Sequence, residues 1–291
     1  RLALDEALIR AAGEAGADIV RGVSVAAMRV DDGGATVTTD GAGHSARHLA
    51  LATGKHNLRG WPRTPGAVTG YKIQLALNAA ARADLAGRVH LTLFDGGYVG
   101  ACLVEGDLAT VCWQIDTEAL KRVGPDWRAH LDAFSRQSPR LGDLLAGAVP
   151  ASERPATISN LPFGYVRREG IAPGVFPVGD QMAVIPAFTG DGTSIALASG
   201  IGAARAVLAG ESAIAFQRRF AGALGRQFAL ARVVNATLRA RVTRGLTVAA
   251  VGVVPQLATM LARATRLSAL VPYRSSTMKY AENPGPNAAS T

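Results

Sequence analysis

Cysteine, aromatic residues and charged residues are all scarce in this chain of 291 residues. With two Cys, the composition excludes a disulfide framework and any cysteine-rich metal site. Aromatic residues make up 5% and charged residues 18%, against 48% hydrophobic residues. This balance excludes global disorder and supplies a sizeable core, and the length is typical of roughly two domains.

Lysine contributes little to the positive charge. The chain has 31 Lys and Arg against 22 Asp and Glu, a net charge of +9, and the lysines are Lys55, Lys72, Lys121 and Lys279. The arginines are scattered apart from a cluster over 218–244, and no basic run is interleaved with aromatic residues. Nucleic acid is therefore not expected as a partner. Anionic cofactors and acidic lipid head groups match this charge better.

Motifs for hydrolysis, metal binding and secretion are also absent. Neither His-Glu-x-x-His nor Gly-x-Ser-x-Gly occurs. No leader with a cleavage site follows Arg1, which favours a cytoplasmic protein. The sequence thus predicts no metal site, and it identifies no catalytic residue.

The first third of the chain has the pattern of a helix followed by a β-meander. Apolar residues at helical spacing predict a helix over 2–15. Strands are expected over 23–30, 35–39 and 46–52, separated by Gly-rich turns, and the last runs into Thr53-Gly54.

The middle of the chain predicts an antiparallel sheet. Strands are expected over 68–77, 89–94, 98–104 and 108–115, with turn signals such as Asp95-Gly96-Gly97 between them. A broken helix over 125–147 and a strand over 158–165 should follow.

The last part of the chain is mainly helical. A short apolar strand over 175–178 precedes a helix over 193–208 and an Arg-rich helix over 211–245. Residues 246–262 carry no charge, but the run is short for a membrane span and contains Pro255. We expect a helix that packs on the body or rests on a membrane surface.

Residues 175–210 combine the features of a ligand site. A strand ends in Gly179-Asp180, where ligands bind in open α/β sheets, and a carboxylate there can accept strong hydrogen bonds from a polyol. Gly190 and Gly192 let the backbone approach a flat ring. The following helix begins with free N–H groups and a partial positive charge that stabilise an anionic ligand.

This segment resembles the flavin-contacting part of FAD-dependent oxidoreductases of the aromatic-hydroxylase and geranylgeranyl-reductase superfamily. The resemblance implies that Asp180, after Gly179, binds the FAD ribityl chain. It also implies that the loop from Pro186 through Gly190, Gly192 and Thr193 lies along the flavin pyrimidine.

The N-terminal part is similar to the same superfamily. Arg1-Leu2-Ala3-Leu4-Asp5 resembles an element whose arginine lies near the FAD, and the strand through Val25 would pass the adenine. The run 49–54, which ends at Gly54, resembles the strand that closes the dinucleotide domain near the pyrophosphate.

One expected element is missing. The superfamily opens with a strand and Gly-x-Gly-x-x-Gly, which holds the FAD pyrophosphate, and no such motif occurs here. We expect the missing element to precede Arg1, which would make the chain a fragment with an incomplete FAD site.

The resemblance implies an α/β fold in which an antiparallel-sheet substrate domain interrupts a Rossmann-type FAD-binding domain, followed by C-terminal helices. The expected limits are 1–60 and 166–210 for the FAD-binding domain, 61–165 for the substrate domain, 211–278 for the helices and 279–291 for a disordered tail.

The implied function is an FAD-dependent oxidoreductase, monooxygenase-like, acting on a lipophilic or aromatic small molecule. A reduced nicotinamide or ferredoxin would be the electron donor, and peripheral membrane contact is expected. A flavin-dependent C=C reductase of prenyl lipids remains an alternative. A non-catalytic membrane or interaction module that has lost flavin is a third.

Overall fold

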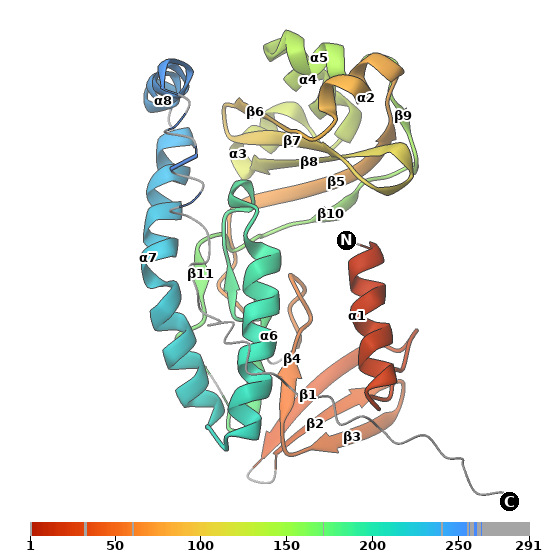
Figure 1. The fold of residues 1–291 in the computed structure, drawn as a ribbon, viewed down its shortest axis with the longest axis vertical. Helices are drawn as coiled ribbons and strands as arrows, with labels where there is room; N and C mark the ends of the chain where they lie inside the picture. The colour runs from red at the N-terminus through yellow and green to blue at the C-terminus, as the bar shows by residue number, and fades with distance from the viewer. Residues whose placement is uncertain are drawn as a thin grey trace, which may run out of the picture.

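The computed structural model describes residues 2–31, 34–59, 61–170, 172–239, 241–254, 256, 259, 260 and 263. Arg1 and the tail 279–291 lie outside these residues. A six-stranded sheet with short helices forms one end of the molecule, and a small three-stranded sheet with α1 (Leu2–Glu14) forms the other (Figure 1). The long helices α6 (Gly192–Leu208) and α7 (Ala213–Arg239) run between them.

The six-stranded sheet is antiparallel throughout. Its order is β10-β5-β8-β7-β6, and β9 adds to β5 beside β10. The strands are β5 (Val68–Ala76), β6 (Val89–Phe94), β7 (Gly97–Leu103), β8 (Leu108–Asp116), β9 (Val149–Pro150) and β10 (Ala156–Ile158). The four strands predicted from 68 to 115 are therefore confirmed.

Short helices cover one face of this sheet (Figure 1). Alternate residues of β8, from Ala109 to Ile115, are fully buried against them. The helices are α2 (Ala79–Leu85), α3 (Thr117–Val123), α4 (Trp127–Gln137) and α5 (Pro139–Leu145). Ser138 is the C-cap of α4 and also the N-cap of α5, since its hydroxyl accepts from Leu141 N. Pro139 follows at the first position of α5, where proline is favoured. The break expected within 125–147 lies there.

A buried histidine belongs to this core. Trp113 Nε1 donates to His130 Nδ1 at 3.2 Å, and His130 Nε2 lies 2.6 Å from Gly124 O. Nδ1 accepts, so Nε2 must donate, and both ring nitrogens of a neutral imidazole are satisfied. His130 is thus a structural residue, with no capacity left for a ligand.

The second core joins a parallel strand pair to the long helices. Strand β12 (Val175–Pro177) pairs in parallel with β4 (Leu49–Leu51), and α6 (Gly192–Leu208) and α7 (Ala213–Arg239) pack on it. Small residues such as Ala198 and Ala203 face Phe216 and its neighbours. The smaller elements are β11 (Tyr165–Val166), β13 (Ala183–Val184) and the 3-10 turns η2 (Gly179–Gln181) and η3 (Ala187–Thr189).

The N-terminal end is less buried. Helix α1 (Leu2–Glu14) agrees with the predicted helix, and β1 (Val25–Asp31), β2 (Gly34–Thr39) and β3 (Ala42–Ala46) form the three-stranded antiparallel sheet.

Two predicted strands were wrong in extent. The run 46–52 is not one strand, because β3 ends at Ala46 and β4 begins at Leu49 in a different sheet. The run 158–165 is mostly loop. Asn160 and Gly164 adopt positive φ values of 58° and 86°, which interrupt extended backbone.

The C-terminal helices are also divided differently from the prediction. Helix α7 is followed by a separate helix, α8 (Arg241–Val253), in place of one helix over 211–245. Leu246 and Val253 are 68% and 83% exposed, so these residues of the uncharged run do not pack on the body as expected. Among the described residues, no helix is long and apolar enough to cross a membrane.

Candidate functional site

An open cleft of about 390 Å³ lies beyond the carboxyl ends of β4 and β12. Because the two strands are parallel, the loops that follow them meet at the same edge. Six of the residues predicted to bind FAD line this cleft together with Lys55, Ala187 and Ala196, and they are Gly54, Gly179, Asp180, Gly190, Gly192 and Thr193.

Three predicted residues do not line the cleft. Pro186 is buried beside it, between Ile185 and Ala187, which do line it. Val25 lies in β1, is 42% exposed and belongs to the three-stranded sheet. Arg1 is outside the described residues. Their assignment to FAD stays a prediction.

Glycine is required at two turns of the cleft. Gly179 has a φ of 56° and Gly190 a φ of 72°, in the left-handed region that other residues rarely adopt. A Cβ built on Gly190 or Gly192 would meet nothing within 4 Å, so the backbone there is open to a flat ligand.

The N-terminus of α6 points its backbone at the cleft through Gly192 and Thr193. Asp191 at the N-cap does not cap this end with its side chain, which is 5% exposed and accepts from Gln227 Nε2 of α7. The helix has 17 residues, so its N-terminus carries a well-developed partial positive charge. This end of the cleft suits an anionic group.

Two buried side chains join the opposite walls. Gln181, with no exposed surface, directs Nε2 at Thr53 Oγ1, Gly54 O and His56 O, at 2.7, 3.0 and 2.7 Å. Arg63, 5% exposed, donates from Nη1 to Asp180 O at 2.7 Å. It also donates to Asn57 Oδ1 at 3.0 Å and to Lys55 O.

The charge of Arg63 is stabilised by the site itself. Burial lowers the Arg63 pKa, and the nearby Asp180 carboxylate opposes that shift. The loop after β4 and the turn after β12 are therefore held in one arrangement before any ligand binds. Sequence analysis missed Arg63 and Gln181, although both adjoin segments that it singled out.

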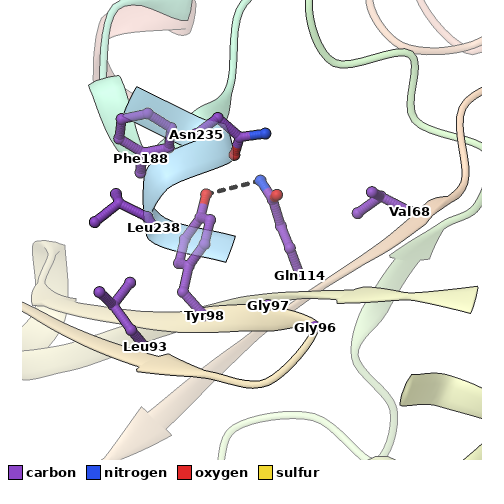
Figure 2. Close-up of a pocket in the computed structure, with 9 residues that line it drawn as sticks. All are labelled: Val68, Leu93, Gly96, Gly97, Tyr98, Gln114, Phe188, Asn235 and Leu238. Carbon is purple, nitrogen blue, oxygen red and sulfur yellow. Dashed lines mark hydrogen bonds between the residues drawn. The ribbon is translucent and has the colours of Figure 1, made fainter. Parts of the chain in front are cut away.

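A second, closed cavity lies against the open face of the six-stranded sheet. Figure 2 shows Tyr98 and Gln114 rising from the sheet, with Phe188 above them and Asn235 and Leu238 on α7. The cavity measures about 20 Å³, room for about one water molecule. Val68, Leu93, Gly96 and Gly97 complete its lining.

The turn η3 separates the two spaces. Ala187 lines the open cleft and Phe188 lines the closed cavity, so these adjacent residues face different sites. The Phe188 ring lies edge-on to Tyr98, with ring centroids 6.5 Å apart. A ligand that extended past η3 would therefore contact both the open cleft and the closed cavity.

Tyr98 retains a donor in the lining of this cavity. Gln114 Nε2 donates to Tyr98 Oη at 2.7 Å, which leaves the phenol proton available. Burial raises the Tyr98 pKa far above its usual value, so the hydroxyl stays protonated near neutral pH. The Tyr98 side chain thus lines the cavity with its ring and its hydroxyl.

Within the described part of the chain, no three His, Cys, Asp or Glu side chains gather as a metal site would require. No family model matches the chain. No curated protein matches it either.

Solved structures share its fold. The match to the flavin-dependent brominase Bmp2 covers 90% of this chain and 68% of the Bmp2 chain, at 15% identity and a TM-score of 0.66. The match to the halogenase PltM, in a complex with phloroglucinol and FAD, covers 81% of this chain and 53% of the PltM chain, at 13% identity and a TM-score of 0.64. The match to PqsL of Pseudomonas aeruginosa, a flavin monooxygenase, covers 81% of this chain and 69% of the PqsL chain, at 19% identity and a TM-score of 0.54.

These likenesses confirm the predicted fold, an α/β architecture shared with FAD-dependent halogenases and monooxygenases. The chain spans between about half and two thirds of the length of these proteins.

Proposed function

We propose that this chain forms the flavin-contacting and substrate-contacting part of an FAD-dependent oxidoreductase. The observation that carries the proposal is the cleft beyond β4 and β12, which gathers six of the nine residues singled out for FAD. A shared fold alone would not require those six residues to meet.

The cleft fits the chemistry of FAD. Asp180 offers a carboxylate for the ribityl hydroxyls, and the open backbone at Gly190 and Gly192 accepts a flat ring without a Cβ in its way. The uncapped N-terminus of α6 would stabilise negative charge on that ring. Arg63 and Gln181 hold these groups in position.

Bound FAD would supply the redox chemistry, either with O2 or by hydride transfer, and the protein would position the reactants. Leu93, Phe188 and Leu238 offer apolar contacts to a substrate, while Tyr98 can donate one hydrogen bond. The cavity now has room for about one water molecule, so an aromatic or lipophilic substrate with one oxygen would use this lining only after Phe188 or α7 moved aside.

Flavin binding tests the proposal. The protein, with any residues that precede Arg1 in its natural form, should show flavin absorbance after incubation with FAD and gel filtration. Asp180→Asn should weaken FAD binding by about tenfold or more, because a charge-assisted hydrogen bond contributes roughly 1.5–3 kcal/mol. Asp132→Asn, on the exposed side of α4, is the matched control. A protein that remains colourless would support the non-catalytic alternative.

The type of reaction needs a separate experiment. We favour a monooxygenase, since the lining suits an aromatic substrate as well as a lipid, and a C=C reductase is the second candidate. With a reduced nicotinamide or ferredoxin as donor, a monooxygenase should place one atom of labelled O2 in its product. A reductase should instead work without O2 and add two hydrogens.

A further inference from the structure

A third hollow lies outside both of these sites. It is a groove of about 600 Å³, and none of its lining residues borders the cleft or the closed cavity. Its lining comes from the connector after β4 and from the segment around β11, namely Trp61, Pro62, Thr64 and residues 165–170.

Arg167 in this groove is a buried cation without a counter-ion. It is 4% exposed, and no described carboxylate forms an ion pair with it. Its guanidinium lies over the rings of Trp61 and Tyr165, at 5.1 and 5.7 Å from their centroids. Burial lowers the Arg167 pKa, as expected for a charge removed from water.

The hydrogen-bonding capacity of Arg167 is largely unused. Nε donates to Gln181 O at 3.1 Å, and it is the one guanidinium nitrogen with a partner among the described residues. Nη2 is fully buried and unpartnered, and Nη1 lies on the side of Gly170, which lines the groove. Buried arginines are normally satisfied by two or more acceptors.

Trp61 adds a second unused donor. It is 8% exposed, and its Nε1 is buried without a hydrogen-bond partner. The same side chain lines the groove and stacks with Arg167. The guanidinium lies 5.1 Å from the Trp61 ring centroid, so its unpartnered Nη2 and the unpartnered indole N–H form one donor set that suits an oxyanion.

The surroundings do not supply that oxyanion. Glu169 lines the groove but is exposed, and Arg168 beside it carries the opposite charge. Arg63 adds further positive potential. Burial lowers the Arg63 pKa, and the nearby charge of Arg167 lowers it further. An anion entering the groove would therefore gain both electrostatic attraction and hydrogen bonds.

We propose that this groove binds the phosphate or carboxylate group of a soluble small molecule, through Arg167 and Trp61. The two aromatic rings would border the ligand, and the guanidinium would donate to its oxygens, first from Nη1 on the side of the groove. The site is distinct from the cleft, so it stands independently of the proposed flavin function.

The indole N–H signals in a nitrogen-labelled sample provide the test. The chain has three tryptophans, and Trp61→Phe identifies the signal of interest. Titration with inorganic phosphate, and then with acetate, should shift the Trp61 signal in a saturable way. The Trp113 signal should stay still, because its N–H is already bound to His130.

Variants assign the effect to the groove. Arg167→Met should weaken phosphate binding about tenfold or more, since a charge-assisted hydrogen bond is lost, while Arg136→Met on α4 should leave it unchanged. If Arg167→Met does not fold, Trp61→Phe decides, because it keeps an aromatic ring and removes the donor. It should weaken binding measured by calorimetry.

The proposal would be overturned by several results. These are an unmoved Trp61 signal with both anions, equal shifts of all three indole signals, or the same affinity in Arg167→Met. Binding to vesicles of anionic lipid without any response to phosphate or acetate would also overturn it.

Discussion

Arg63→Met should loosen the cleft from the inside. Arg63 is 5% exposed and donates three hydrogen bonds, to Asp180 O, Asn57 Oδ1 and Lys55 O. Each bond from a charged donor contributes roughly 1.5–3 kcal/mol, but the substitution also removes the cost of burying the charge. We expect a net loss of about 3 kcal/mol in the free energy of unfolding.

The same change should lower the affinity for FAD. Without Arg63, the loop at Lys55 loses its link to Asp180 and keeps the link through Gln181, so part of the ordering of the binding groups must occur when the ligand binds. Denaturant unfolding of the apoprotein measures the stability, and quenching of flavin fluorescence measures the affinity. Arg63→Lys keeps the charge without the fork, so it should give an intermediate result.

Arg59→Met is the matched control, since Arg59 is exposed in the same segment. The reasoning would be refuted if Arg63→Met matched Arg59→Met in both stability, within about 0.5 kcal/mol, and FAD affinity. A loss of stability without any loss of affinity would show that Arg63 supports the fold but does not position the cleft.

Three further predictions concern the sheet and α8. Gly97→Ala should cost about 1–3 kcal/mol, seen as a lower melting temperature, because its Cβ would stand 1.9 Å from Gln114 O. Tyr98→Phe should cost about 1 kcal/mol at neutral pH in denaturant unfolding. Because burial raises the Tyr98 pKa, Tyr98 contributes stability below the usual tyrosine pKa of about 10, and this contribution is lost as the pH rises further. The variant should therefore lose less stability in alkali than the wild type. Asp95→Asn should remove the ion pair with Arg244, cost less than about 1 kcal/mol overall and speed hydrogen exchange in α8, while Asp107→Asn should not affect that exchange.

The sequence predicted the elements that local signals control. Asp95-Gly96-Gly97 and the alternation along 108–115 located the antiparallel strands, and helical spacing located α6. The glycines and Asp180 could be singled out because their roles depend on the backbone of one short segment.

Long-range contacts were beyond the same reasoning. Gln181 bonds to Gly54 across 127 residues, and Arg63 bonds to Asp180 across 117. A polar residue that is buried by such partners has the same local pattern as one on the surface. For the same reason, the parallel pairing of β4 with β12 could not be predicted from either strand.

Helix α7 gives the molecule a mechanical link. Its 27 residues span about 40 Å. Gln227 donates a hydrogen bond to Asp191 beside the cleft, and Asn235 and Leu238 line the second cavity further along the same helix (Figure 2). Gln227 and Leu238 lie about 16 Å apart along the helix, so a tilt of about one degree about Gln227 moves Leu238 by roughly 0.3 Å. A substrate that entered beside Tyr98 and displaced α7 would also move the Gln227 contact at the N-cap of α6, so filling one compartment would change the shape of the other.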